Sequence, residues 1–318
     1  MEPRFLERAL ELAERGRGTT HPNPIVGAAV VLEGEIVGEG WHERKGAPHA
    51  EVVALEAAGE NASGSTVYVT LEPCAHHGAT PPCTDALLGA GVARVVAGQR
   101  DPNPEHGGGL ERLREGGVDV QVADGELAFR CRQQIEEWRT WMASARPFVT
   151  YKVAVTLDGR VRVPGERWVT GEASRKLVHV LRAQSDAVAV GMGTVRWDNP
   201  RLDVRGVPVV RQPRRIAFGR GPLPEGSELE LRAGPLRDEL GELAADGVQS
   251  LLLEGGPTLA AAYLEGDLVD KVLVFVAPRI SGEGPGMLEG IPRPLELSRM
   301  TARPIGDDVL LQAYLNEP

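Results

Sequence analysis

Hydrophobic positions in the first 125 residues switch between helical and strand spacing. Apolar side chains recur every three or four positions over residues 5–13, which predicts an amphipathic helix. Residues 25–32 and 35–40 flank Glu33-Gly34 and predict a hairpin. Beyond it, helices are predicted at 49–58, 83–88 and 109–115, and strands at 66–71, 92–97 and 118–122. This alternation predicts an α/β sheet covered on both faces, with ligands at the carboxyl ends of its strands.

The second half of the chain begins after a long helical pattern. The pattern predicts one helix from Glu126 to Ala143, and Pro147 favours a break because proline disfavours helix in the residue before it. We therefore place a domain boundary at about residue 146, giving domains 1–145 and 146–318. Downstream, the patterns predict a strand from residue 148, a helix at 172–183, a nearly all-apolar central strand at 186–192, and a strand followed by a glycine turn at 251–256.

Composition narrows the classes of protein. The chain has 318 residues, of which 42% are hydrophobic and 25% charged, as in globular proteins with more than one core. Its net charge of −10, from 35 basic and 45 acidic residues, argues against a nucleic-acid surface, which needs clustered Lys and Arg. Cysteine is scarce, and neither a signal peptide nor a membrane-length apolar run is present. We expect a cytoplasmic protein without a membrane partner.

The strongest chemical pattern lies between residues 49 and 83. His49, Cys74 and Cys83 offer one imidazole and two thiolates, the three protein ligands of a catalytic Zn²⁺ whose fourth position is left to water. Glu51 follows the histidine by two residues, as the general acid/base does in zinc deaminases. Each ligand alone would be interpreted as a core residue. A structural zinc site is the other alternative, with His76, His77 or a distant residue as fourth ligand.

These motifs resemble the cytidine and nucleotide deaminase superfamily. The eight residues between Cys74 and Cys83, together with residues 20–27, 70–74 and 101–104, are similar to the bifunctional deaminase–reductase family of riboflavin biosynthesis. The resemblance implies a cytidine-deaminase-like three-layer domain followed by a dihydrofolate-reductase-like domain. It also implies Zn²⁺ and NADPH as cofactors, pyrimidine ribotides as small-molecule substrates, and a homo-oligomer.

The same resemblance implies which residues of the first half contact the deaminase substrate. The alternative for these residues is ordinary loop and turn chemistry, because two of the asparagines precede proline. Where family members carry Lys or Arg, this chain has Ala79, so a phosphate contact is missing or is supplied from elsewhere. The implied substrate contacts are Asn23, His42, His76, Asp101 and Asn103.

In the second half, motifs around Lys152, Arg182, Thr194 and Glu254 resemble the reductase part of that family. By itself, Lys152 either faces solvent or binds a ligand, and the glycine turn after Glu254 indicates a plain strand–helix connection. The resemblance implies NADPH contacts at Lys152, Val155, Trp168, Thr194, Asp198, Gly256, Pro257, Thr258 and Leu259. It implies substrate contacts at Arg167, Arg182, Leu202, Arg205 and Glu254.

The sequence thus predicts a two-step enzyme of riboflavin biosynthesis. Zinc-dependent hydrolytic deamination of a diaminopyrimidinone ribotide would be followed by NADPH-dependent reduction of its ribosylamino group to ribitylamino. Two alternatives stay open. A tRNA adenosine or nucleotide deaminase with an accessory domain would share the zinc chemistry, and a non-enzymatic zinc-stabilised nucleotide-binding protein would need four protein ligands.

Overall fold

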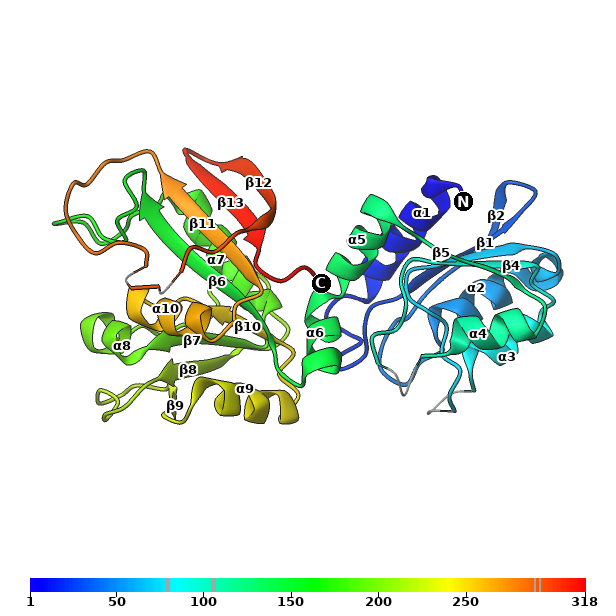
Figure 1. The fold of residues 1–318 in the computed structure, drawn as a ribbon, viewed down its shortest axis with the longest axis horizontal. Helices are drawn as coiled ribbons and strands as arrows, with labels where there is room; N and C mark the ends of the chain where they lie inside the picture. Colours follow the sequence, from blue (N-terminus) through cyan, green and yellow to red (C-terminus); the bar gives the residue numbers. More distant parts are fainter. Residues whose placement is uncertain (78–80, 104–106, 289, 292) are drawn as a thin grey trace. The chain divides into compact units, whose positions relative to one another are not determined.

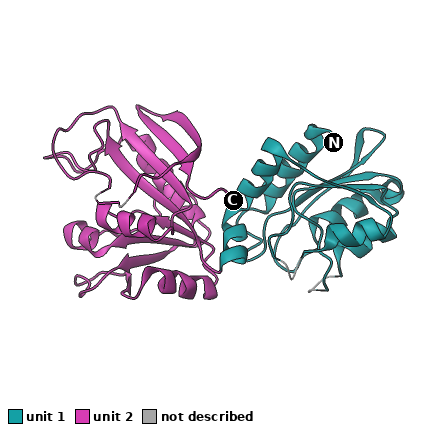
Figure 2. Cartoon of the chain, in the orientation of Figure 1, with its two compact units in different colours: residues 1–144, 318 teal, residues 145–317 magenta. Residues whose placement is uncertain are grey.

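A computed structural model describes residues 1–77, 81–103, 107–288, 290–291 and 293–318 of the chain (Figure 1). These residues form two compact units (Figure 2): unit 1 contains residues 1–144 and Pro318, and unit 2 contains residues 145–317. Ala79 lies outside the described residues. Across the described part of the chain, no helix combines the length and apolar character needed to cross a membrane.

Unit 1 is a five-stranded sheet with strand order β2-β1-β3-β4-β5. β1 pairs antiparallel with β2 and β3, whereas β3, β4 and β5 are parallel. The strands are β1 Gly27–Leu32, β2 Glu35–Trp41, β3 Thr66–Val69, β4 Arg94–Ala97 and β5 Asp119–Val122. The helices are α1 Pro3–Ala13, α2 Ala50–Ala58, α3 Cys83–Gly89, α4 Gly109–Glu115, α5 Gly125–Gln134 and α6 Glu136–Ser144, with short 3₁₀ turns at Glu14–Gly16 and Gly59–Ala62.

The two faces of this sheet are covered by different helices, as the alternating pattern predicts. Ala28 and Val30 of β1 belong to a buried cluster with α2, α3 and α4, whereas Val31 belongs to a cluster with α1 and α5. The predicted hairpin is confirmed, and both of its turn residues, Glu33 and Gly34, have positive φ angles of 52° and 84°. Such angles are typical of tight hairpin turns.

The prediction of one continuous helix over 126–143 is wrong. α5 ends at Gln134 and α6 begins at Glu136, because Ile135 leaves the helical conformation with φ −127° and ψ 32°. The break redirects the chain between two buried clusters, since Cys131 packs with α1 while Trp138 packs with Leu71. The apolar spacing continues through the break, so periodicity alone does not reveal it.

Unit 2 is an eight-stranded sheet with strand order β12-β13-β11-β6-β10-β7-β8-β9. β12 and β13 are the antiparallel strands at one edge, and the strands from β11 to β9 are parallel. The strands are β6 Phe148–Thr156, β7 Ala187–Gly191, β8 Arg214–Phe218, β9 Glu230–Arg232, β10 Ser250–Leu253, β11 Lys271–Ala277, β12 Ser298–Ile305 and β13 Asp308–Tyr314. The helices are α7 Glu172–Gln184, α8 Met192–Asp198, α9 Leu236–Ala245 and α10 Pro257–Glu265.

β6 lies in the middle of this sheet and presents different side chains to its two faces. Val149, Tyr151 and Val153 pack into the buried cluster that contains α9 and α10 residues. Because side chains alternate along a strand, Lys152 faces the opposite side. Ala154 on that side packs with Val178 of α7. Lys152 therefore points to the face covered by α7.

Two glycines bring α2 close to the sheet of unit 1. A Cβ added at Gly40 would lie 2.3 Å from the carbonyl oxygen of Ala50, and one added at Gly38 would lie 2.2 Å from that of Ala54. Since these neighbours are helix backbone, they cannot move aside locally. The glycines of β2 thus fix where the N-terminus of α2 lies.

We expect Gly40→Ala to destabilise unit 1 by about 1–3 kcal/mol, the usual cost of forcing extra atoms into a packed interior. Thermal unfolding followed by circular dichroism measures the change. Gly89→Ala is the matched control, because Gly89 is exposed and an added Cβ there meets no atom of the described residues within 4 Å. Equal melting temperatures for the two variants would contradict the close packing.

Candidate active site

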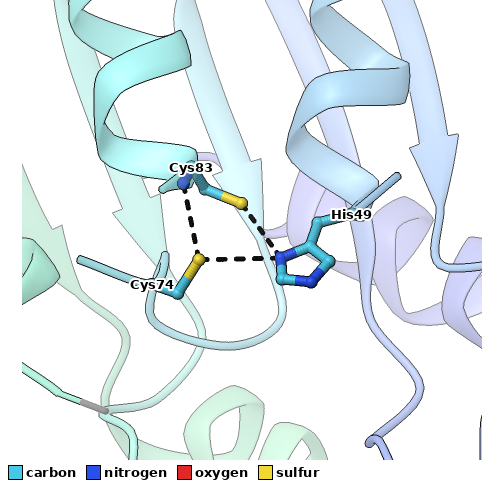
Figure 3. A group of neighbouring side chains, drawn as sticks. All are labelled: His49, Cys74 and Cys83. Carbon is cyan, nitrogen blue, oxygen red and sulfur yellow. Dashed lines mark hydrogen bonds between the residues drawn. The ribbon is translucent and has the colours of Figure 1, made fainter. Parts of the chain in front are cut away.

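His49, Cys74 and Cys83 converge on one point of unit 1, as Figure 3 shows. His49 directly precedes α2, Cys83 is the first residue of α3, and Cys74 follows β3. The Nδ1 atom of His49 lies 3.2 Å from the Sγ atom of Cys83 and 3.6 Å from that of Cys74. All three ligand atoms lie within 4.8 Å of one another. The predicted ligand set is therefore assembled, and Nδ1 is the histidine atom that faces the sulfurs.

The charges in this group fit a divalent cation. The pKa of the Cys74 thiol falls to about 4, because Cys83 and then His49 hydrogen-bond to its sulfur. The backbone N–H of Cys83 also donates to that sulfur at 3.4 Å. The pKa of Cys83 is raised, because a second thiolate would lie beside the first and be buried. A cation among the three side chains would favour both thiolates at once, and zinc prefers this donor set.

Cys131 differs from both ligands. It is 1% exposed in α5, and burial raises the pKa of its thiol to about 12. It is not part of the cation-binding group found among the described residues. Cys131 thus behaves as a buried apolar side chain of α5.

Glu51 lies in the first turn of α2, two residues after His49. Its side chain is 3% exposed. Burial raises the pKa of its carboxyl, and the neighbouring His49 offsets part of that rise. A buried carboxyl whose pKa lies above its ordinary range is suited to accept a proton and return it.

A cavity of about 480 Å³ opens over these residues. Its lining includes His49, Glu51 and Cys74, so the candidate cation position and the carboxyl share one space. Of the predicted substrate contacts, Asn23, His42, His76 and Asp101 line the cavity. Asn103 is not among the lining residues, and its backbone N–H donates to Asp101 at 2.8 Å.

His42 and Asn23 form a fixed polar pair in this cavity. The Nδ1 atom of His42 lies 3.2 Å from the carbonyl oxygen of Pro48, and its Nε2 atom lies 3.2 Å from the side-chain nitrogen of Asn23. Burial lowers the pKa of His42. A neutral ring that donates from Nδ1 must accept at Nε2, so the Asn23 amide directs its N–H to His42.

Sequence reasoning missed several residues of the cavity wall. Glu72 is 5% exposed, and its carboxylate accepts backbone N–H groups from Asp101, Gly108 and Leu110 at 3.0–3.1 Å. It thereby holds the segment after β4 against the residues that lead to Cys74. The available signal was its place in the 70–74 stretch that carries the family resemblance, two residues before Cys74. The other lining residues without an assigned role include Lys45, Trp138 and Trp141.

In unit 2, three charged side chains meet on the α7 face of the sheet. Arg182 of α7 donates from Nε to Glu254 at 2.6 Å and from Nη2 at 3.1 Å. Lys152 of β6 donates to the same carboxylate at 3.4 Å. All three side chains are largely shielded from solvent, with exposed fractions of 10–14%. Of the two sequence interpretations of Lys152, solvent exposure is therefore wrong.

Two glycine-containing turns lie side by side at the carboxyl ends of β7 and β10. A Cβ added at Gly191 or Gly255 would lie 3.3 or 3.1 Å from the Leu259 side chain, and one added at Gly256 would lie 3.4 Å from Thr194 Oγ1. Gly256 immediately precedes α10. Glycine backbones at such a helix start allow the phosphates of a dinucleotide to approach closely, so these turns fit NADPH.

The remaining predicted reductase residues lie in varied surroundings. Val155 and Leu202 are each 3% exposed and belong to buried clusters. Trp168 is half exposed, with the Arg167 guanidinium 4.9 Å from its ring centre. Arg205 pairs with Asp203 at 3.3 Å, and the Asp203 carbonyl accepts from Arg182. A separate cavity of about 280 Å³ in unit 2 is lined by none of the predicted reductase residues.

Two family models and several relatives match this chain. The model for the cytidine and deoxycytidylate deaminase zinc-binding region matches residues 1–99, and that for the RibD C-terminal domain matches residues 147–311. Riboflavin biosynthesis protein RibD of Aquifex aeolicus is 38% identical, covering 98% of both chains, and that of Escherichia coli is 41% identical, covering 87% of this chain and 88% of the relative.

Solved structures agree with these sequence matches. Acinetobacter baumannii RibD, form 1, is 34% identical with a TM-score of 0.85 and 98% coverage of both chains. The Thermotoga maritima diaminohydroxyphosphoribosylaminopyrimidine deaminase/5-amino-6-(5-phosphoribosylamino)uracil reductase is 34% identical with a TM-score of 0.83 and the same coverage. The predicted fold class, a deaminase-like domain followed by a reductase-like domain, is confirmed.

Proposed function

Because this chain belongs to the RibD family of riboflavin biosynthesis proteins, we propose that it catalyses two successive reactions on a pyrimidine ribotide. Unit 1 deaminates a diaminopyrimidinone ribotide by hydrolysis, and unit 2 reduces the ribosylamino group to ribitylamino with NADPH. The observation that carries the proposal is the convergence of His49, Cys74 and Cys83 beside buried Glu51 in one cavity.

In the deaminase reaction, His49, Cys74 and Cys83 would hold Zn²⁺, which supplies a Lewis acid that activates water. Glu51 accepts a proton from the attacking water as its oxygen bonds to the ring carbon that carries the amino group. When the carbon–nitrogen bond breaks, Glu51 returns the proton to the departing ammonia. The Asn23 amide, held by His42, presents its oxygen to an N–H of the pyrimidine. Asp101, His76 and Asn103 are the further proposed substrate contacts.

In the reductase reaction, the turns at Thr194 and at Gly256–Leu259 would hold NADPH, which supplies the hydride. Proposed cofactor contacts from the rest of unit 2 are Lys152, Val155, Trp168 and Asp198. Arg167, Arg182, Leu202, Arg205 and Glu254 are the proposed substrate contacts. The protein mainly orients the two reactants here, because the hydride chemistry belongs to the cofactor.

The test is to incubate the purified protein with the diaminopyrimidinone ribotide, with and without NADPH, and to measure released ammonia and oxidised cofactor. Ammonia should appear without NADPH, and NADPH should be consumed once the deaminated product is present. Cys83→Ser should lose both zinc and ammonia release while still reducing added deaminated product. Cys131→Ser is the matched control and should keep both activities. No ammonia release from the zinc-loaded wild-type protein would refute the proposal.

The proposal also covers the tRNA deaminase alternative, the cellular location and the oligomeric state. A tRNA deaminase would not need unit 2, whose residues 147–311 match the RibD C-terminal domain. The free thiols of the ligand pair suit a reducing cytoplasm, which we propose as the location. We also propose a homo-oligomer.

A further inference from the structure

Acidic residues outnumber Lys and Arg among the described residues that line the deaminase cavity. Glu51, Glu72 and Asp101 contribute three carboxyl groups. Among the described residues, Lys45 is the only Lys or Arg in the lining. Both ring nitrogens of His42 are already engaged, one by the Pro48 carbonyl oxygen and the other by the Asn23 side-chain nitrogen. Apart from the proposed Zn²⁺, a phosphate dianion entering this cavity would therefore meet one permanently charged basic side chain, that of Lys45.

Lys45 lies at the rim, in the loop that joins β2 to α2. The backbone N–H of Ala47 donates to the carbonyl of Arg44 at 3.0 Å, so Lys45 and Gly46 are the two central residues of a tight turn. Gly46 has φ +83°, the positive angle that a type II turn requires at its second central position. The Lys45 side chain is exposed, and no ion pair or hydrogen bond engages its ammonium within the described part of the chain.

The ends of this loop are tied down near the reacting centre. The Thr19 hydroxyl donates to the carbonyl of Glu43, and the His42 ring contacts the carbonyl of Pro48. His49, a proposed zinc ligand, follows directly. Lys45 is thus presented from a short, anchored loop whose Gly46 and Ala47 also line the cavity.

Arg100 and Arg112, which do not line the cavity, already have acidic partners. Arg112 donates to Asp85 at 2.5 Å, and Arg100 donates to Glu111 at 2.9 Å. In the sequence, residues 75–82 and 101–107 include neither Lys nor Arg. A phosphate bound by either arginine would have to displace an existing ion pair, whereas no ion pair engages the Lys45 ammonium among the described residues.

We propose that Lys45 binds the phosphate of the ribotide substrate and so selects phosphorylated over dephosphorylated pyrimidine ribosides; this inference rests on the proposed deaminase function. With the pyrimidine at Glu51, the ribosyl phosphate extends toward the rim, where the ammonium donates to its oxygens. Such a charge-assisted hydrogen bond acts on substrate binding. It lies away from the atoms that react, so it leaves the chemical step unchanged.

The test compares ammonia release from the ribotide and from the corresponding dephosphorylated riboside. Lys45→Ala should raise KM for the ribotide about tenfold, the scale of one charge-assisted hydrogen bond, with kcat nearly unchanged. Lys45→Glu should raise it further. The KM for the riboside should change in neither variant. Added salt should weaken ribotide binding to the wild-type protein more than to Lys45→Ala.

Arg44→Ala is the matched control, because Arg44 is the exposed neighbour, lies 3.7 Å from Glu43 and does not line the cavity. Its KM should equal that of the wild-type protein, and all variants should retain wild-type zinc content. An unchanged ribotide KM in Lys45→Ala, or an equal rise for ribotide and riboside, overturns the inference while the wild-type activity upholds the deaminase function. Absence of ammonia release from the wild-type protein overturns both.

Discussion

Glu51→Gln should reduce ammonia release from the diaminopyrimidinone ribotide by about 100- to 10,000-fold, the range that general acid–base catalysis contributes. The amide keeps the shape of the carboxyl but cannot carry the proton from the attacking water to the leaving ammonia. Glu51 is only 3% exposed, and it is the carboxyl nearest in sequence to the zinc ligand His49. Zinc content and the NADPH-dependent reduction of added deaminated product should stay at wild-type levels, because neither depends on that proton transfer.

Glu56→Gln supplies the matched control, since Glu56 is an exposed residue of the same helix. It should release ammonia at the wild-type rate. If Glu51→Gln lost zinc as well as activity, its role would be to support the ligands instead of moving protons. If Glu51→Gln lost both ammonia release and NADPH-dependent reduction, the proposal that the two reactions occur at separate sites would be contradicted.

The zinc ligands could be predicted from sequence because residue type and short spacing carry most of the signal. His49 and Cys83 lie at helix starts, and Cys74 follows a strand, so local pattern already places all three at element ends. Few side chains combine the required ligand chemistry. The predicted hairpin and the helix at 109–115 were found for the same reason, since their signals are local.

Family resemblance indicated four further lining residues, Asn23, His42, His76 and Asp101. The other parts of the cavity wall could not be predicted, because they are assembled from distant segments. Trp138 and Trp141 line the cavity from α6, which lies far from the zinc ligands in sequence. This helix begins after the break at Ile135, which the apolar periodicity does not reveal. Lys45 looks like any exposed loop lysine until the cavity beside it is known. In unit 2, sequence indicated several strands but not that β6 lies between β10 and β11, because strand order depends on long-range pairing.

The Glu254 carboxylate links β6 to α7, because it pairs with Lys152 of the strand and Arg182 of the helix. Glu254 follows β10, Lys152 lies on β6 and Arg182 on α7. Burial alone would raise the pKa of Glu254, but Lys152 and Arg182 lower it to about 2. The carboxylate is therefore ionised in the folded protein well below the pH at which an ordinary glutamate takes up a proton.

Glu254→Gln should destabilise unit 2 by about 3–5 kcal/mol, because it leaves two buried cations without their counter-ion. Loss of the reductase reaction should accompany this change, whereas ammonia release by unit 1 should persist. Limited proteolysis across a urea series measures the effect, since fragments report the two units separately. Glu228→Gln is the control: Glu228 pairs with Arg215 at 3.0 Å but is 71% exposed, and such pairs contribute about 0–1 kcal/mol.

The same carboxylate predicts how the stability of unit 2 depends on pH. A glutamate whose pKa falls from 4.5 to about 2 on folding contributes stability that is fully present above pH 4.5. That contribution is lost as the pH falls from 4.5 toward 2, because protonation then favours the unfolded chain. Urea midpoints for unit 2 should therefore decline more steeply over this interval in the wild-type protein than in Glu254→Gln. Parallel declines would show that Lys152 and Arg182 do not hold the carboxylate in its ionised form.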